Sequence, residues 1–203
     1  MKQKRFKMPL IFLLLMNLLV ACQMNTEQEN HQDQENPGVE TLASKEAKEA
    51  KEELIKEVTL QNTEGETIGE AILTQMVNGV LITLDASNLP PGVHGFHIHE
   101  KGICEPPTFE SAGGHFNPTN SKHGFDHPEG PHAGDLPNII VRDDGTVKAE
   151  VFADMVTLET GKENSLLQES GTSLMIHSGA DDYRSQPSGD AGDRIACGVI
   201  TNK

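Results

Sequence analysis

The chain has 203 residues, a formal charge of −15 at pH 7, 4% aromatic residues and no tryptophan. This acidity argues against a nucleic-acid-binding protein, because such proteins present basic surfaces to phosphate. With so few aromatic side chains, a core must depend on Val, Ile, Leu, Ala and a few Phe.

The N-terminus has the features of an export signal. Four Lys or Arg residues fall within the first seven positions, and an apolar run broken only by Asn17 follows over 10–20. The run is shorter than the about 20 apolar residues that span a bilayer, and its length suits a signal peptide. Leu19-Val20-Ala21-Cys22 resembles a bacterial lipobox, in which the Cys receives a diacylglyceryl group and becomes the first residue of the mature chain. We expect a signal peptide over 1–21, lipidation of Cys22 and export to the extracytoplasmic face of the cell membrane, where two acyl chains anchor stably. The alternative is an ordinary signal peptide followed by a chance Cys.

Residues 22–57 are expected to be a lipidated Cys followed by a flexible acidic tether. Gln, Asn and Glu dominate this segment and it has no aromatic residue, a composition typical of disordered chains. The stretch 44–57 has helix-forming residues and a Glu52–Lys56 pair, but such a helix is marginal alone. We favour a solvated spacer over a partner-binding helix.

The remaining chain, 58–203, is expected to form one all-β domain. Short runs of alternating apolar and polar residues are separated by turn residues, and no long amphipathic helix is visible. Turns are predicted at 62–66 and 78–79, and Asp143-Asp144-Gly145 predicts a hairpin. Strands are expected over 58–61, 69–73, 80–84, 95–100, 138–142, 147–152, 173–177 and 194–200. This spacing predicts a β-sandwich or barrel.

A segment rich in Gly, Pro and His over 101–137 has no strand pattern. So long a loop within a compact domain needs another source of order. The loop contains five residues that could order it by binding metal or forming a disulfide: His115, His123, His132, Asp135 and Cys104. If Cys22 is lipidated, Cys104 and Cys197 are left, and export would place both in an oxidising compartment. Metal ions, and a disulfide that ends at Cys104, could therefore order the loop.

The histidines of the domain indicate metal binding. His97 and His99 are two apart on a predicted strand, so both side chains leave the same face and can reach one ion. His132 and Asp135 put an imidazole and a carboxylate a turn apart. Imidazole suits zinc and copper, and a carboxylate among imidazoles suits zinc. Each residue has an ordinary alternative, such as a core or capping role for His177, but together they predict more than one metal site.

The motifs of this domain resemble those of the copper/zinc superoxide dismutases in order and spacing. The resemblance runs from about residue 58 to the C-terminus, and it is the combination of motifs that makes it specific. The matching peptides are Gly95-Phe96-His97-Ile98-His99, Ser111-Ala112-Gly113-Gly114-His115-Phe116-Asn117-Pro118, Lys122-His123-Gly124, His132-Ala133-Gly134-Asp135-Leu136, His177 with Ala180-Asp181-Asp182, and Gly192-Asp193-Arg194-Ile195-Ala196-Cys197-Gly198-Val199-Ile200. The resemblance implies an eight-stranded antiparallel Greek-key β-sandwich or barrel with long metal-binding loops.

The resemblance also implies how two metals are held. The copper ligands would be His97, His99, His115 and His177. The zinc ligands would be His115, His123, His132 and Asp135. His115 would bridge the two ions as an imidazolate, and the carboxylate of Asp181 would join His97 to His123. Such outer partners set the tautomer and orientation of the ligands.

A disulfide between Cys104 and Cys197 is a further implication of the family. It would pin the long loop to the last strand, next to Arg194. A cross-link over so long a separation stabilises by roughly 4–5 kcal/mol in the chain-entropy model.

The implied activity is dismutation of superoxide to oxygen and hydrogen peroxide in two one-electron steps. Copper would be the redox ion, His115 would take up and return a proton, and zinc would serve structure and electrostatics. Superoxide is an anion, and Arg194 beside copper would attract it. The Debye length is roughly 8 Å at physiological salt, so distant acids would be screened and the local positive charge would dominate. The alternative for Arg194 is a surface salt bridge with Asp190 or Asp193.

The segment 178–193 departs from the eukaryotic pattern. It is short, as in bacterial members of the family, and Arg184 is its only cation. Electrostatic guidance of superoxide is therefore expected to be weaker than in members with a longer loop.

Two other functions are compatible with part of the sequence. One is a non-catalytic lipoprotein that buffers copper or zinc on the same fold. The other is a structural or adhesive surface domain in which zinc serves stability alone. The complete set of copper ligands together with Arg194 favours the enzyme, because neither alternative needs both.

Overall fold

The computed structural model describes residues 54–202, which form nine β-strands and one short 3-10 turn. The elements are β1 (Ile55–Asn62), β2 (Thr67–Met76), β3 (Gly79–Ala86), β4 (Gly92–His94), β5 (Phe96–His99), η1 (Glu110–Ala112), β6 (Ile139–Val141), β7 (Val147–Ala153), β8 (Thr172–His177) and β9 (Arg194–Ile200). All eight expected strands are present, and β4 is additional. The prediction of an all-β domain is confirmed.

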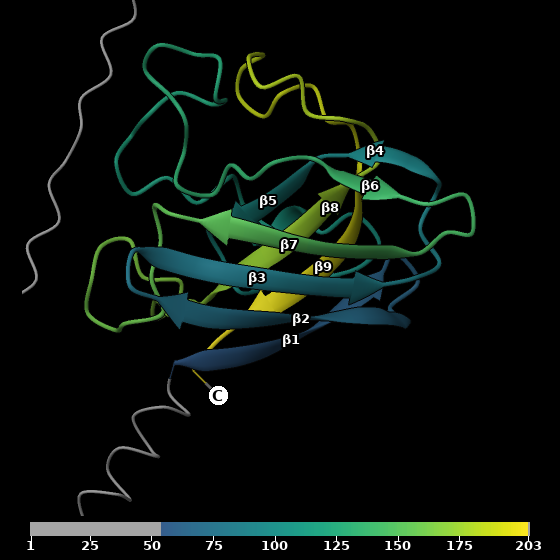
Figure 1. Ribbon diagram of the computed structural model, residues 1–203, viewed down its shortest axis with the longest axis horizontal. Helices are drawn as coiled ribbons and strands as arrows, with labels where there is room; N and C mark the ends of the chain where they lie inside the picture. The colour runs from purple at the N-terminus through teal and green to yellow at the C-terminus, as the bar shows by residue number, and fades with distance from the viewer. Residues whose placement is uncertain (1–53, 203) are drawn as a thin grey trace, which may run out of the picture. The chain divides into compact units, whose positions relative to one another are not determined.

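Seven strands form one curled antiparallel sheet in the order β5-β8-β9-β1-β2-β3-β7, and β4 pairs with β6 separately. Figure 1 shows β1, β2, β3 and β7 as one layer, with β5, β8 and β9 crossing behind it. The connections from β3 to β5 and from β7 to β8 run between opposite ends of the strand order. These long crossovers give the sheet its Greek-key character.

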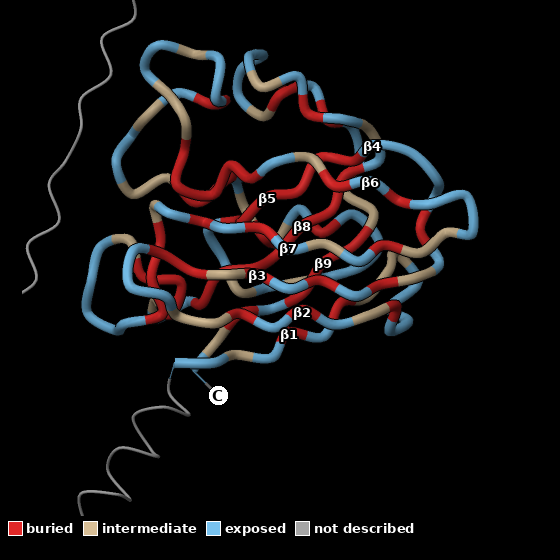
Figure 2. The backbone as a smooth tube through the Cα atoms, in the orientation of Figure 1, coloured by how far each residue is buried: buried red, intermediate tan, exposed pale blue. Residues whose placement is uncertain are grey.

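The main core fills the space between the two layers. Leu60, Leu73 and Ile82 point into it from the first layer, and Ile98 and Leu174 from the second; all five are fully buried in one apolar cluster. Figure 2 shows buried and exposed residues alternating along β1, β2 and β3, as the two-residue period of a strand requires.

Strand β8 differs because all six of its residues are buried. Leu174 and Ile176 belong to the main core, whereas Met175 packs in a second small cluster with Phe109, Ala112 and Cys197. Phe109 and Ala112 come from the loop that follows β5. This loop therefore covers the outer face of β8.

The long loop is ordered in part by hydrogen bonds to the free edge of β5. The N–H of Ile98 donates to the carbonyl of Gly134 (2.8 Å), and the N–H of Phe116 donates to the carbonyl of Ile98 (2.8 Å). A Cβ at Gly134 would collide with the Ile98 carbonyl, so this close approach requires glycine. The result is that the loop's histidines lie beside those of β5.

Two details of the prediction were wrong. The predicted hairpin at 143–145 forms only its turn, because β6 pairs with β4 while β7 pairs with β3. Strand β1 also begins at Ile55, within the range expected to be tether or helix, because Ile55–Glu57 pair with Ile72–Thr74 of β2.

The expected signal peptide, Cys22 and the tether up to residue 53 lie outside the described residues. Within 54–202, no helix is long and apolar enough to cross a membrane.

Candidate metal centre

Strand β5 sends its side chains to two different environments. It pairs with β8 in a register that sets His97 opposite Met175 and His99 opposite Ser173. Phe96 and Ile98 point into the main core, so His97 and His99 leave by the opposite face, beneath the long loop. Both histidines are nonetheless buried, with 0% and 1% of their surface exposed.

Four histidines converge on one point beneath the loop. They are His97, His99, His115 and His177, and one ring nitrogen of each lies within 4.8 Å of the corresponding nitrogens of the others. Nδ1 of His97 and Nε2 of His99, His115 and His177 are buried and have no hydrogen-bond partner. Unpartnered buried nitrogens are unfavourable unless something binds them. Four imidazole nitrogens aimed at a common point fit a copper ion.

The other ring nitrogen of each of these histidines is held by a hydrogen bond. The Asp181 carboxylate binds Nε2 of His97 (2.7 Å), and the carbonyls of Gly113 and Gly192 bind Nδ1 of His99 (3.0 Å) and of His177 (3.2 Å). A carbonyl only accepts a hydrogen bond, so Nδ1 of His99 and of His177 carries the proton. Nε2 of each ring therefore offers a lone pair.

A second group consists of His115, His123, His132 and Asp135. Nδ1 of the three histidines lies 2.7, 3.0 and 3.2 Å from the same oxygen, Oδ1 of Asp135. The other carboxylate oxygen accepts hydrogen bonds from the N–H groups of Gly124 (2.8 Å) and His132 (2.9 Å). Three nitrogens and one oxygen are a donor set that suits zinc.

His115 belongs to both groups through different atoms. Its Nε2 faces the four-histidine group, and its Nδ1 faces Asp135. A single imidazole is therefore placed between two metal positions.

Burial sets the charge of the four-histidine group. It lowers the pKa of His115 to about 4 and that of His177 to about 3, with a further contribution from the nearby ring of His97. Burial likewise lowers the pKa of His99 well below its usual value. These rings are neutral at neutral pH, which is the state that binds a metal ion.

The second group is anionic at its centre. Burial acts to raise the pKa of Asp135, but hydrogen bonds from His115, His123 and His132 hold it well below the usual range. Burial acts to lower the pKa of His123, but its hydrogen bonds to Asp135 and Asp181 raise it to about 9. In the absence of a metal ion, His123 therefore tends to hold the proton that an ion would displace.

Asp181 connects the two groups. Its Oδ2 binds Nε2 of His97 (2.7 Å) and its Oδ1 binds Nε2 of His123 (3.0 Å). Asn138 holds the main chain of Asp181 from both sides, accepting from its N–H and donating to its carbonyl (both 2.9 Å). The N–H of Tyr183 donates to the carboxylate (2.6 Å).

Arg194, at the start of β9, is held by carbonyls of the long loop. Nη1 donates to Phe109 (2.6 Å), and Nη2 donates to Gly113 (2.7 Å), whose carbonyl also binds His99. Within residues 54–202 the guanidinium makes no ion pair with Asp190 or Asp193, so the structure contradicts the salt-bridge alternative for Arg194. The side chain lines an open pocket together with Glu110, Asp193 and Thr108.

A disulfide joins Cys104 to Cys197 across 93 residues, with the Cα atoms 5.7 Å apart. It lies against Phe109 and Met175 in the second apolar cluster. The carbonyl of Cys104 also accepts a hydrogen bond from Gln61 of β1 (2.7 Å). The loop that carries the Arg194 contacts is thus attached to the sheet covalently.

The sequence did not point to two residues that support the centre, His94 and Gln186. His94 is buried, with its ring nitrogens 2.7 Å from the carbonyl of His177 and 2.8 Å from that of Pro90. Gln186 contacts the main chain of His123. His94 lies just outside the family-like peptide that starts at Gly95, and nothing near Gln186 in the sequence pointed to His123.

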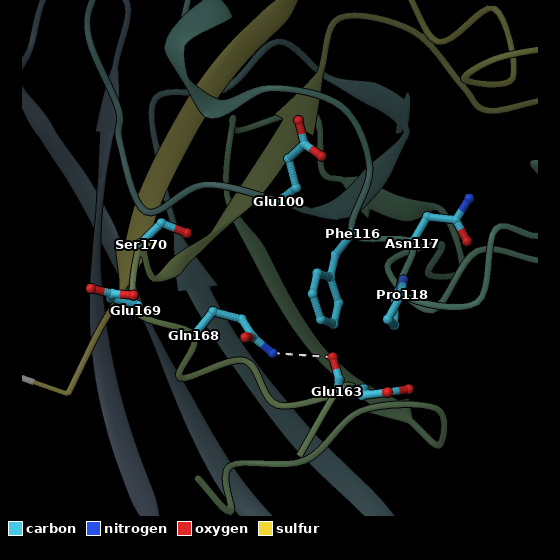
Figure 3. Close-up of a pocket in the computed structure, with 8 residues that line it drawn as sticks. All are labelled: Glu100, Phe116, Asn117, Pro118, Glu163, Gln168, Glu169 and Ser170. Atoms are coloured by element: carbon cyan, nitrogen blue, oxygen red, sulfur yellow. Dashed lines mark hydrogen bonds between the residues drawn. The ribbon is translucent and has the colours of Figure 1, made fainter. Parts of the chain in front are cut away.

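A separate hollow lies where the long loop meets the segment 154–171. Figure 3 shows it lined by Phe116, Gln168 and three carboxylates, those of Glu100, Glu163 and Glu169. None of the residues of the two ligand groups lines this hollow.

A curled antiparallel sheet that carries a four-nitrogen site and an adjoining three-nitrogen, one-oxygen site fits a protein that binds copper and zinc side by side. The family model described as copper/zinc superoxide dismutase (SODC) matches residues 67–200. The chain belongs to this family, copper and zinc are its cofactors, and it is an enzyme of the superoxide dismutase class.

Individual relatives and solved structures are consistent with this family assignment. The chain is 60% identical over 142 residues to copper-zinc superoxide dismutase 2 of Aquifex aeolicus, covering 70% of this chain and 83% of that protein. It is 46% identical over 145 residues to the superoxide dismutase-like protein YojM of Bacillus subtilis, covering 70% and 74%. Among solved structures, it is similar to a SOD-like protein from Bacillus subtilis, with a TM-score of 0.69, 46% identity and coverage of 71% and 97%. The copper/zinc superoxide dismutase of Brucella abortus matches with a TM-score of 0.60, 32% identity and coverage of 72% and 99%.

Proposed function

We propose that this chain dismutates superoxide to oxygen and hydrogen peroxide outside the cytoplasm, at a copper/zinc centre that Cys22 anchors to the membrane through lipid. The observation that carries the catalytic part is the set of four buried, unpartnered imidazole nitrogens, one of which belongs to a ring shared with the second group. Copper supplies the one-electron redox chemistry when it is bound, and the protein supplies its geometry, its charge and a route for protons.

In this proposal the copper ligands are His97 through Nδ1 and His99, His115 and His177 through Nε2. The zinc ligands are Nδ1 of His115, His123 and His132 and one carboxylate oxygen of Asp135. Asp181 orients a ligand of each metal. These roles explain why both ring nitrogens of His97, His115 and His123 are engaged by a metal position or a carboxylate.

His115 is proposed to carry a proton during turnover. Its Nε2 has no partner within the protein, so this atom can hold a proton whenever it does not bind a metal. Its Nδ1 remains directed at Asp135 and the zinc position throughout, which keeps the ring in place.

Arg194 is proposed to attract superoxide. Its guanidinium is held by two carbonyls and remains positively charged, while one edge of the side chain lines an open pocket. A fixed cation at a concave site concentrates an anionic substrate.

The proposed location depends on the N-terminus and the disulfide. Residues 1–22 have the pattern of a lipoprotein signal, and disulfides persist in oxidising compartments outside the cytoplasm. The tether of residues 23–53 would then separate the domain from the membrane.

The catalytic proposal is tested by metal analysis of the exported protein together with a dismutation assay before and after copper loading. We expect one copper and one zinc per chain and activity that depends on copper. A protein that binds both metals without turnover would instead be the metal-buffering lipoprotein.

The anchor is tested with Cys22→Ser. We expect the mature protein to move from the membrane fraction to the soluble fraction, with activity per bound copper unchanged. If Cys22→Ser protein stays on the membrane, the anchor lies elsewhere.

A further inference from the structure

Gln186, in the loop between β8 and β9, makes an unusual set of hydrogen bonds for an exposed side chain. The N–H of His123 donates to its Oε1 (3.0 Å), and its Nε2 donates to the carbonyls of His123 (2.9 Å) and Arg184 (3.0 Å). The amide thus pairs with both main-chain groups of a single residue, as a neighbouring strand would. That residue belongs to the second ligand group.

His123 is therefore held at four points. Its ring nitrogens contact Asp135 and Asp181, and its main-chain N–H and carbonyl contact Gln186. Asp181 and Gln186 come from the same loop, 178–193. The loop fixes the direction of the ring through Asp181 and the position of the main chain through Gln186.

The main chain that follows His123 also lies in direct contact with the main chain of the loop 178–193. The N–H of Asp126 donates to the carbonyl of Tyr183 (3.1 Å). A Cβ at Gly124 would collide with the Tyr183 carbonyl, so only glycine allows this approach. A lost Gln186 contact cannot be replaced by a closer approach of the two chains, because no space remains between them.

We propose that Gln186 is a positioning residue for the zinc-binding half of the centre. It holds the main chain of His123 where Nδ1 points at the metal position, and zinc retention depends on it. This inference rests on the proposed function, because it takes His123 as a zinc ligand.

The effect is confined to one metal. The outer nitrogens of the copper ligands are held by Asp181, Gly113 and Gly192, and Gln186 contacts none of these three residues in the described structure. Loss of the Gln186 amide removes a constraint from the zinc group and leaves the hydrogen bonds of the copper group in place.

Gln168 provides a matched control. It is a loop glutamine whose Nε2 donates to the carbonyls of Lys162, Glu163 and Ser165 (3.2, 3.1 and 2.9 Å), and Figure 3 shows the contact with Glu163. Gln168→Ala removes the same amide and three hydrogen bonds, as many as Gln186→Ala removes, without touching a metal ligand. It shows how general loosening of a loop affects metal release.

The experiment compares wild type, Gln186→Ala, Gln186→Glu and Gln168→Ala as disulfide-bonded protein loaded with copper and zinc. Release of each metal to a chelator is followed separately, and the absorption spectrum is recorded with cobalt in place of zinc, because cobalt reports ligand geometry where zinc is silent. We expect zinc to leave Gln186→Ala about tenfold faster than wild type, the lower end of the range for losing an outer partner of a ligand. Copper release should not change, and the cobalt bands should shift.

Gln186→Glu should fall between wild type and Gln186→Ala, because it can still accept from His123 N–H but cannot donate to the carbonyl. Gln168→Ala should behave as wild type in every measurement. The inference is overturned if zinc leaves Gln186→Ala and Gln168→Ala at the same rate, or if copper release accelerates as much as zinc release. An error in the proposed function would appear differently, as full zinc retention in Asp135→Ala.

Discussion

The two faces of β5 are equally buried but are stabilised in different ways. Phe96 and Ile98 lie on the inner face among apolar side chains, where removal from water is favourable by itself, at about 25 cal/mol per Å². His97 and His99 lie on the outer face, where each keeps a ring nitrogen without a partner. Burial of such an atom is unfavourable until a ligand binds it. We therefore expect metal binding to stabilise the covering loops more than the sheet.

Removal of both metals should have the largest effect, and it should affect the outer face of β5 more than the inner face. Ligand present at 1,000 times its dissociation constant stabilises by about 4 kcal/mol, which corresponds to roughly 8–16 °C in the melting temperature of a domain of this size. We expect chelation to abolish activity and to lower the melting temperature by at least that amount. Hydrogen exchange should show protection lost over 113–138 and kept in β1, β2 and β3. A uniform loss across the domain would contradict the division into two regions.

Ile98→Ala tests the inner face. Truncation of this fully buried side chain should reduce the free energy of unfolding by about 2–5 kcal/mol. Because the defect lies in the apolar core, its size measured by denaturant unfolding should be the same in metal-free and metal-loaded protein. The control is Ile72→Ala on the exposed face of β2, which should have a much smaller effect. A loss seen only in the metal-loaded form would show that the two faces are not independent.

Asp135→Ala tests the outer face. The variant should bind copper but not zinc, and its melting temperature under metal-saturating conditions should fall by about 5 °C or more, because a zinc-linked contribution of over 1 kcal/mol is lost. Asp154→Ala, at an exposed carboxylate after β7, is the matched control. Equal melting temperatures for Asp135→Ala and wild type would rule out zinc as a source of order in the loop.

Arg194→Ile should separate catalysis from metal binding. Copper and zinc contents should remain those of wild type, because Arg194 contacts carbonyls and not the ligand nitrogens. The dismutation rate should fall by about tenfold at low salt, and its dependence on ionic strength should weaken. Arg142→Ile changes the net charge equally at an exposed site and should have little effect. Full activity with an unchanged salt dependence in Arg194→Ile would show that this charge does not guide the substrate.

Glu110→Gln should have the smallest effect, in the opposite direction. Glu110 and Arg194 line the same pocket; burial lowers the pKa of Arg194, and the nearby Glu110 carboxylate acts to raise it. Neutralising Glu110 should raise the rate up to about twofold at low salt, because an acid that repels superoxide is removed. Glu150→Gln on the outside of β7 makes the same change in net charge and should leave the rate unaltered. If Glu110→Gln and Glu150→Gln have equal dismutation rates, any gain in rate comes from the net charge and not from the position of Glu110.

Local pattern was sufficient for much of the fold. Most strands of the main sheet were predicted because alternation has a period of two residues and is visible within a segment, whereas β8 contains a short continuous apolar run. The short strand β4 was missed because its three residues form a strand only by pairing with β6, far along the chain. The hairpin was predicted from a correct turn, yet its two strands find different partners.

Motif composition and spacing were similarly informative about which residues could bind metal. The resemblance to a family supplied the division into two sets of ligands, and residues of the same identity converge in the structure. Neither source indicated Gln186 or His94, because each acts through the main chain of a residue 63 or 83 positions away.

The sequence by itself determined the strand periodicity, the number and type of metal-ligating side chains and the acidity of the chain, since these depend on residues near one another or on composition alone. The tertiary structure decided which ring nitrogens have no hydrogen-bond partner and which carbonyls hold Arg194. It also decided how the loop 178–193 binds the ring and the main chain of His123. Those features are hydrogen bonds between segments brought together by sheet register and loop closure. Their energies depend on distances and angles that no local pattern specifies.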